Sequence, residues 1–457
     1  MSKTNMSRRG FLGASAQIGM LGAMSTLGLL GMPRSAKAAP VSDYKALVCV
    51  YLFGGNDGNN MIVPLDATHY NAYNAIRGSQ GLALSVNAKT LTAQRSARLS
   101  NGVDQPFAFH YGMPEIDALY GQGMVAGLLN VGNLRQPLTK AQYQSGANVP
   151  PQLFSHPDQN IQNQAGTPSA AGTGWGGRLV DALGNSGHLD AVSVGAGGLF
   201  VEGSSVHGNL LPGTGQLDLA GMNFWPQNEA DTRRAALLQI LSAQNPNLIA
   251  QAANKSLLNG MDLVKDLQAA NTGAPLSTVF PGYSLAQQLK TVAQLIRLRS
   301  TQGPGRQVYF VSLSGFDTHG GQAYQQFDML RQVSQSVAAF QQALHEINAE
   351  QLVTTFTMSD FGRSLQPNSG GTDHGWGNHH LIIGAAVKGG LYGQFPDFVL
   401  GGKDDATGRG VWIPQISNQQ YGATLGRWFG AEADVLENQI FKNELSNFSV
   451  KDLGFMV

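Results

Sequence analysis

The apolar positions of this chain gather into short continuous runs, rich in Val, Leu and Phe, that end abruptly at glycine or at polar clusters. Runs of this length are typical of strands that are buried on both faces, as in a parallel sheet. The strands predicted in this way are Ala46–Phe53, Met124–Val131, Leu189–Val194, Gln307–Leu313, Leu352–Met358 and Leu381–Val387.

Stretches between these runs repeat their apolar residues with the period of a helix. The predicted helices are Met113–Tyr120, Gly176–Leu183, Leu285–Leu298 and Gln322–Ile347. Strands that alternate with helices predict an α/β fold, in which a mostly parallel sheet is flanked by helices on both faces. The segment from about 223 to 271 is almost purely helical in composition, so we expect a helical insertion there.

The first 38 residues have the three-part pattern of a cleavable signal. Arg8 and Arg9 come directly before an apolar pair, a weakly apolar stretch covers residues 14–32, and residues 36–38 read Ala-Lys-Ala. Paired arginines before a weak apolar stretch indicate export by the twin-arginine translocase. The alternatives are a chance arginine pair ahead of an ordinary signal, or a short anchor helix.

We therefore expect residues 1–38 to be removed and residues 39–457 to work in the periplasm or outside the cell. No later segment reaches the ~18 consecutive apolar residues of a membrane span, so no stable membrane anchor is expected. The signal carries five basic residues and no acidic one, so the 29 basic and 29 acidic residues of the chain become 24 and 29, a net charge of −5. This balance argues against nucleic acid as a partner, because binding to it needs a basic surface.

The single cysteine, Cys49, lies inside the first predicted strand and is most simply a buried small hydrophobic residue. One cysteine excludes an internal disulfide, an iron–sulfur cluster held by the protein alone and a cysteine-rich zinc site. Charged residues make up 13% of the chain, against about 25% in average globular proteins, and glycine is abundant. The composition is that of a folded, loop-rich extracytoplasmic protein.

Residues with metal-ligand side chains follow three of the predicted strands, where ligands bind in open α/β sheets. They are Asp57 after the first strand, Asp317 and His319 after Gln307–Leu313, Asp360 after Leu352–Met358, and Asp373, His374, His379 and His380 close behind. Carboxylates mixed with imidazoles suit Zn²⁺, Mn²⁺ or Fe, and carboxylates alone suit Ca²⁺ or Mg²⁺. The alternative, for Asp57 above all, is an ordinary turn or helix-cap residue.

These motifs resemble those of domain-of-unknown-function family 1501, over about residues 44–455. They read Gly-Gly-Asn-Asp-Gly-x-Asn at 54–60, Phe-Asp-Thr-His-Gly-Gly-Gln at 316–322, and Asp-Phe-Gly-Arg at 360–363 with Gly-Thr-Asp-His-Gly at 371–375. That family is similar in fold to the alkaline phosphatase and sulfatase superfamily. The resemblance implies two neighbouring metal ions at the carboxyl edge of the sheet.

Within that resemblance, Asp57 matches an aspartate that binds one metal, and Asp317 with His319 matches the pair that binds the other. Asp360 matches the aspartate of an Asp-His pair, but Phe361 stands where the resemblance calls for histidine. Either the later pair Asp373-His374 has moved in as the missing ligand, or one metal site is degraded. In the first case we expect the loop after residue 363 to fold back over the strand ends.

Two residues are candidates for catalysis. Ser155 precedes His156-Pro157 at a predicted helix start, where free N–H groups attract anions, so it is the candidate nucleophile; otherwise it is a plain N-cap. Arg363 has the planar fork that binds phosphate or sulfate oxygens, and is otherwise an ion-pair partner.

The sequence therefore predicts a hydrolase of phosphate or sulfate esters that uses one or two divalent ions, Zn²⁺, Mn²⁺, Fe or Ca²⁺. We expect Asp57, Asp317, His319 and Asp360 to converge in one cleft and His374 or Asp373 to be a ligand. His379 or His380 is expected to support that ligand or to cap the other metal ion. The rival prediction is a non-catalytic extracytoplasmic binding or assembly factor, for instance for a polysaccharide, because a fold that lacks a ligand need not be an enzyme.

Overall fold

A computed structural model describes residues 43–168, 172–184, 187, 189–213, 226–243, 246–272, 275–299 and 305–457. The predicted signal at residues 1–38 lies outside the described residues. Within the described part, no helix combines the length and the apolar character that crossing a membrane requires.

Among the described residues, the core of the protein is a nine-stranded, mostly parallel sheet. In spatial order its strands are β13 (Gly390–Tyr392), β5 (Val125–Gly132), β12 (Asn378–Ile383), β9 (Val353–Ser359), β1 (Tyr44–Phe53), β8 (Gly305–Ser314), β6 (Ala191–Val194) and β7 (Asn209–Leu211), with β14 (Ile416–Ser417) beside β5. The central strand β1 is parallel to both of its neighbours, β8 and β9.

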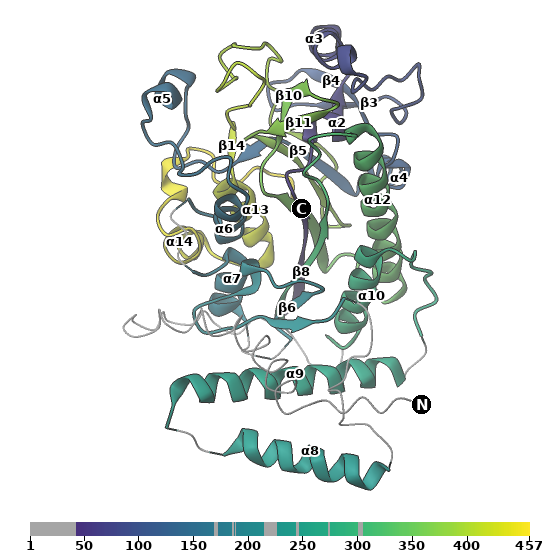
Figure 1. The fold of residues 1–457 in the computed structure, drawn as a ribbon, viewed down its shortest axis with the longest axis vertical. Helices are drawn as coiled ribbons and strands as arrows, with labels where there is room; N and C mark the ends of the chain where they lie inside the picture. The colour runs from purple at the N-terminus through teal and green to yellow at the C-terminus, as the bar shows by residue number, and fades with distance from the viewer. Residues whose placement is uncertain are drawn as a thin grey trace.

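Helices cover both faces of this sheet (Figure 1). Alternate residues of β1 point into two different cores: Val48 and Val50 belong to one, Cys49 and Tyr51 to the other, and all are fully buried. The first core also receives apolar residues from α4 (Pro114–Gly121), α10 (Ser284–Arg297) and α12 (Gln322–Glu346), and the second from α7 (Trp175–Leu183) and α13 (Asn418–Phe429). The predicted α/β architecture is confirmed.

The six predicted strands and four predicted helices all form, with one difference in orientation. The run Leu381–Val387 was expected to be parallel, but β12 is antiparallel to both β5 and β9. A parallel strand needs a crossover, usually a helix, to carry the chain back to the starting edge of the sheet. The segment between β9 and β12 holds only a hairpin, β10 (Arg363–Asn368) and β11 (Gly371–His374), so the chain returns in the opposite direction.

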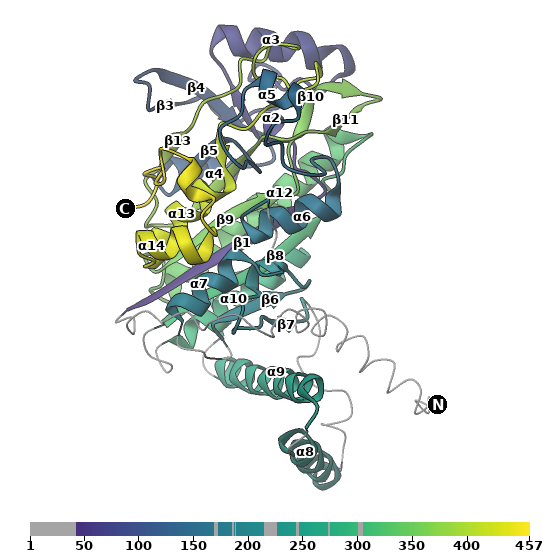
Figure 2. The same ribbon diagram turned by 90° about the vertical axis from the view of Figure 1, so that its left-hand side faces the viewer.

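Smaller elements surround the sheet. They are β2 (Ile62–Pro64), β3 (Arg95–Arg98) and β4 (Asp104–Phe109), which form a separate sheet, and α2 (Gly58–Met61), α3 (Ala67–Arg77), α5 (Lys140–Ser145), α6 (His156–Ala165) and α14 (Ala433–Val435). The segment expected to be a helical insertion holds α8 (Gln227–Ser242) and α9 (Leu248–Thr272). Figure 2 shows α8 and α9 at one end of the molecule and the β10–β11 hairpin at the other.

Candidate metal centre

Three neighbouring strands end side by side. Phe53 of β1 pairs with Ser314 of β8, and Leu52 pairs with Ser359 of β9. The chain then turns at Gly54, which has φ +114° and whose N–H donates to the Asp360 carboxylate at 3.1 Å. A Cβ on Gly54 would lie 2.4 Å from the backbone nitrogen of Asp317. Glycine therefore lets the loops after β1 and β8 approach closely.

Asp317 lies at the centre of three imidazole rings at this edge. Its Oδ1 is 2.9 Å from Nε2 of His319 and 3.2 Å from Nε2 of His374, and its Oδ2 is 3.5 Å from Nε2 of His156. The Nε2 atoms of His319 and His374 are 3.1 Å apart. Asp317 is 44% exposed, so the cluster is open to solvent. We call these four residues the Asp317 cluster.

The opposite ring nitrogen of each histidine faces an acceptor. Nδ1 of His374 donates to the backbone carbonyl of Phe154 at 2.9 Å, and Nδ1 of His156 donates to Asp360 at 2.6 Å. Nδ1 of His319 is within ion-pair distance of Asp373, at 3.7 Å. When Nδ1 carries the proton of a neutral imidazole, Nε2 presents a lone pair. The Nε2 lone pairs of His156 and His374 therefore both face Asp317, which is how outer partners prepare histidines for a metal.

The charges of the cluster also suit a cation. Partial burial would raise the pKa of Asp317, but the bond to Arg363 and its charge, with His319 and His156, bring that pKa below its ordinary value. Burial lowers the pKa of His374, and the nearby Arg363 and His156 add to this. Metal ligands must be deprotonated, so an anionic Asp317 and a neutral His374 are the required forms.

The donor set fits a transition metal better than Ca²⁺. One ligand atom each from His156, Asp317 and His374 lies within 4.8 Å of the other two, and Nε2 of His156 is buried without a hydrogen-bond partner among the described residues. Two imidazole nitrogens and one carboxylate oxygen, with His319 beside Asp317 and His374, suit Zn²⁺, Mn²⁺ or Fe, whereas Ca²⁺ prefers oxygen alone.

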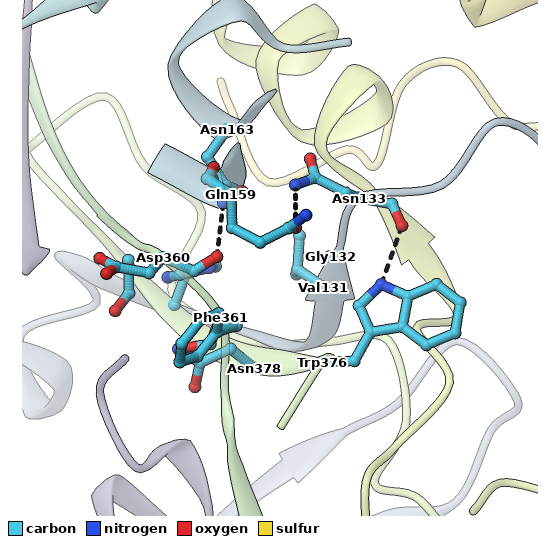
Figure 3. A pocket seen from close by; sticks show the side chains of 11 residues that line it. Val131, Gly132, Asn133, Gln159, Asn163, Asp360, Phe361, Trp376 and Asn378 are labelled. Atoms are coloured by element: carbon cyan, nitrogen blue, oxygen red, sulfur yellow. Dashed lines mark hydrogen bonds between the residues drawn. The ribbon is translucent and has the colours of Figure 1, made fainter. Parts of the chain in front are cut away.

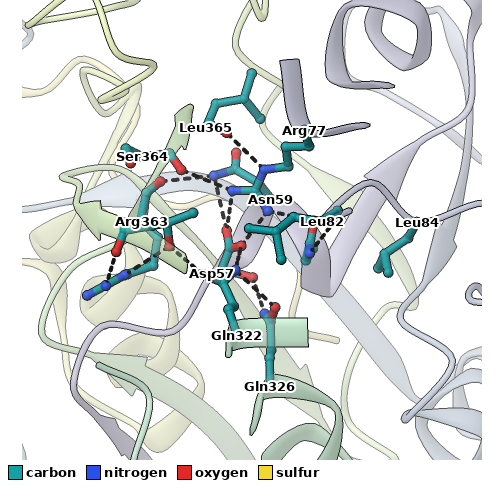
Figure 4. A network of polar contacts seen from close by, with 12 residues as sticks. Asp57, Asn59, Arg77, Leu82, Leu84, Gln322, Gln326, Arg363, Ser364 and Leu365 are labelled. Carbon is teal, nitrogen blue, oxygen red and sulfur yellow. Dashed lines mark hydrogen bonds and ion pairs between the residues drawn. The ribbon is translucent and has the colours of Figure 1, made fainter. Parts of the chain in front are cut away.

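Asp57 does not reach this cluster. It is 2% exposed, and its two oxygens bind the guanidinium of Arg77 at 2.5 and 3.0 Å, with a further bond from Gln322 (Figure 4). Asp57 therefore forms its ion pair with Arg77 and not with a metal ion, because both of its carboxylate oxygens are bound by the buried guanidinium.

Asp360 and Asp373 border the Asp317 cluster without pointing lone pairs into it. Asp360 accepts bonds from Gly54 and His156, so it orients His156; burial raises its pKa, and the bonds from His156 and Gly54 offset part of that rise. Asp373 pairs with Arg409 at 2.7 Å on the rim.

His379 and His380 lie inside the molecule on β12. Nδ1 of His379 accepts the backbone N–H of Asn130, and the ring of His380 stacks on Tyr421 with centroids 5.7 Å apart. Burial lowers the pKa of His379 to about 4 and that of His380 to about 3. His380 helps to line a polar cavity of about 10 Å³ beside Asp360 and Phe361, which is room for about one water molecule (Figure 3). Neither histidine contacts the Asp317 cluster.

The two residues predicted to be catalytic are both engaged within the protein. Ser155 is the N-cap of α6, and its hydroxyl donates to Asp158 in the first turn of that helix. The side chain of Arg363 is fully buried and donates to Asp317 at 2.8 Å and to the Thr372 carbonyl. In this geometry Arg363 holds Asp317 in place, because its donors already have acceptors inside the protein.

His156 belongs to the Asp317 cluster, whereas from the sequence it is only a histidine in another loop and is not chosen as a ligand. It is the first residue of α6, in the Phe-Ser-His-Pro motif that singled out Ser155. Phe361 packs against both His156 and His374, with ring centroids 4.8 and 4.6 Å away, and the two imidazole rings contact each other with centroids 4.5 Å apart. The ring that replaces the expected histidine thus supports two others. The helix start was a usable signal, but it drew attention to the hydroxyl instead of the imidazole.

Comparison with known proteins gives a family and a set of distant structural likenesses. Residues 44–408 match the family described as protein of unknown function (DUF1501), the family that the motifs resemble. No curated protein matches the sequence.

Several solved structures are distantly similar to the chain, including the following three. The structure of Ps i-CgsB in complex with k-i-k-neocarrahexaose is 11% identical (TM-score 0.35, 90% of this chain and 77% of that one). PsFucS1 sulfatase from Pseudoalteromonas sp. is 11% identical (TM-score 0.36, 97% and 77%). The lipoteichoic acid synthase LtaP from Listeria monocytogenes is 8% identical (TM-score 0.35, 88% and 76%).

Proposed function

The chain belongs to the DUF1501 family, whose description assigns no activity, and from the geometry of the site we propose that it is a metal-dependent hydrolase of phosphate or sulfate esters. The observation that carries the proposal is the convergence of three Nε2 atoms on the Asp317 carboxylate at an exposed sheet edge. A divalent ion bound there would supply a Lewis acid and a water of lowered pKa.

The residues of the chain have separate tasks in this proposal. His156, Asp317 and His374 would hold the ion, with His319 as a further ligand beside them, and the Nδ1 partners of His156 and His374 fix the tautomers of these two rings. Arg363 holds Asp317, and Asp360 holds His156. Since Asp57 is already neutralised by Arg77, we expect one ion per chain and not two. Zn²⁺, Mn²⁺ and Fe are the expected metals, because imidazole dominates the donor set.

Metal content and ester hydrolysis test this proposal. Wild-type protein should bind one equivalent of Zn²⁺ or Mn²⁺ and hydrolyse p-nitrophenyl phosphate or p-nitrophenyl sulfate. His156→Ala and His374→Ala each remove a ligand, so metal affinity should fall by more than the roughly 10–100-fold that follows loss of an outer partner. The matched control is His345→Ala, because His345 is exposed at the end of α12 and pairs with Glu350.

The outcomes are distinct. If both ligand variants retain wild-type metal content, the Asp317 cluster is not a metal centre and the proposal fails. If the wild type binds metal but hydrolyses neither ester, the second candidate function holds: a non-catalytic, metal-containing binding or assembly factor for an anionic polymer. The internal engagement of Ser155 and Arg363 favours this second candidate, because neither predicted catalytic group is free to meet a substrate.

We also propose that residues 39–457 form one domain with an insertion at about 223–271, exported by the twin-arginine translocase to the periplasm or the exterior. The arginine pair and the cleavage motif at residues 36–38 support the route. Replacing Arg8 and Arg9 together by lysine should leave full-length precursor in the cytoplasm, as measured by fractionation and the mass of the protein. Normal cleavage and export of this double variant would exclude the route.

A further inference from the structure

A buried network connects Asp57 to the Asp317 cluster, and Figure 4 shows the part of it around Asp57, Gln322 and Arg363. Asp57 is an acceptor only, and Nε2 of Gln322 donates to its Oδ2 at 2.5 Å. The side-chain amide of Gln322 therefore turns its Oε1 to Thr372, whose hydroxyl donates to it at 2.6 Å. Because that hydroxyl proton is used, Thr372 Oγ1 accepts from Nε of Arg363 at 3.2 Å. Nη1 of Arg363 then donates to Asp317 at 2.8 Å.

The same carboxylate also fixes the backbone of Arg363 and of the residues after it. Nδ2 of Asn59 donates both to Asp57, at 3.2 Å, and to the carbonyl of Arg363, at 3.0 Å. Arg77, held by Asp57, donates to the carbonyls of Ser364 and Leu365, each at 3.0 Å. The position of the guanidinium of Arg363 and that of its main chain thus both depend on the buried carboxylate of Asp57.

We infer that Asp57, Gln322 and Thr372 are positioning residues that set the affinity of the Asp317 cluster for its ion. This inference rests on the proposed function. Each donor and acceptor role in this chain of hydrogen bonds is fixed, because the carboxylates at its two ends can only accept and Arg363 can only donate, to Thr372 on one side and to Asp317 on the other. Breaking it in the middle leaves Nε–H of Arg363 buried without an acceptor and releases one restraint on Asp317. Loss of an outer partner of this kind typically costs 10–100-fold in metal affinity.

Substitution of Thr372 tests the inference, because Asp57→Asn leaves Arg77 as an uncompensated buried charge and endangers folding. Thr372→Val keeps the shape and removes the hydroxyl, whereas Thr372→Ser keeps the hydroxyl. Zn²⁺ affinity, measured by competition with a chelating dye, should fall about tenfold or more in Thr372→Val and stay within about threefold in Thr372→Ser. The matched control is Thr424→Val in α13, whose buried hydroxyl bonds Gln420 and Leu453. It should lower the melting temperature without changing Zn²⁺ affinity.

Three results overturn the inference: wild-type affinity in Thr372→Val, equal losses in Thr372→Val and Thr372→Ser, or an equal loss in Thr424→Val. Wild-type protein that binds no Zn²⁺ overturns the proposed function instead. In that case the hydrogen-bond network is tested in the metal-free protein. NMR of arginine-labelled protein measures the hydrogen exchange rate of the Arg363 Nε–H. Faster exchange in Thr372→Val but not in Thr372→Ser supports the network, and unchanged exchange refutes it.

Discussion

Two histidines of this protein show how the neighbouring backbone decides what an imidazole can do. Nδ1 of His374 faces a carbonyl oxygen and must carry the proton, so its Nε2 offers a lone pair to the Asp317 cluster. Nδ1 of His379 faces the N–H of Asn130 and must accept, so its Nε2 carries the proton. That Nε2 is buried with no partner among the described atoms. The tautomer alone disqualifies His379 as a ligand through Nε2.

Gly54 offers a test at the same scale. Alanine there would adopt a positive φ and place Cβ 2.4 Å from the backbone nitrogen of Asp317, which has little room to move. Gly54→Ala should therefore displace Asp317 and lower Zn²⁺ affinity about tenfold or more, with a stability loss of about 1–3 kcal/mol. Gly81→Ala is the matched control, because Gly81 also has positive φ but no atom within 4 Å of its Cβ. Equal Zn²⁺ affinity in the two variants would contradict the prediction.

Among the elements, the β10–β11 hairpin is what brings His374 to the site. Arg363 pairs with His374 across the hairpin, so the residue that holds Asp317 and a proposed ligand share one ladder. The turn between the strands has φ 52° at Ser369 and 79° at Gly370, the two positive values of a type I′ turn. Serine is poorly suited to the first of these positions, where asparagine or glycine is preferred.

Ser369→Asn should therefore stabilise the protein by about 0.5–1 kcal/mol, because Asn-Gly is the favoured pair for this turn. The measurement is the midpoint of urea unfolding at constant slope. Ser369→Val is the opposite control, since a β-branched residue resists positive φ and should destabilise. If Ser369→Asn lowers the urea midpoint, the stability of the turn is not set by the backbone preference of residue 369.

The hairpin also marks how far sequence reasoning reached. From the sequence, the segment after Arg363 is expected to fold back over the strand ends, because Pro367, Asn368, Ser369 and two glycines make it flexible enough to do so. The pairing of β10 with β11 could not be predicted from the local sequence. Polar and apolar residues do not alternate along these two segments as they do in a half-buried strand.

At the scale of the whole molecule, three buried histidines make stability depend on pH. Burial lowers the pKa of His110 to about 3, of His379 to about 4 and of His380 to about 3. The unfolded chain binds protons at these sites below about pH 6.5, and the folded chain does not. The free energy of unfolding should therefore have its full value above pH 6.5. It should fall as the pH drops toward 4, by up to about 1.4 kcal/mol per pH unit for each histidine.

Urea unfolding between pH 7 and pH 4.5 measures this slope. His380→Phe keeps a ring that can stack on Tyr421 and removes one titrating group, so its slope should be shallower than that of the wild type by about one proton. His345→Phe, at an exposed position, should keep the wild-type slope. Parallel curves for wild type and His380→Phe would mean that His380 is not held neutral by the fold.

The sheet was predictable because strands that are buried on both faces are continuous apolar runs in the sequence. The edge that carries Asp317 and Asp360 was predictable because parallel strands have their carboxyl ends at the same edge of a sheet. The ion pair of Asp57 with Arg77 was not predictable. Arg77 ends helix α3, and nothing in its local pattern distinguishes it from an exposed arginine. His156 was not chosen as a ligand because it does not follow a strand. It begins α6, which lies about midway along the chain between two strands of the sheet.

The place of β1 in the sheet has a consequence for synthesis. Its two neighbours, β8 and β9, come from residues 305–314 and 353–359, so this central strand, the first described strand to be made, is paired only after a long stretch of chain has followed it. A nascent chain must be extended past residue 305 before β1 can gain its first partner. Until then its apolar edges are open to other chains, which is the condition for aggregation. A chain that terminates anywhere before β8 therefore contains β1 without either of its partners in the sheet.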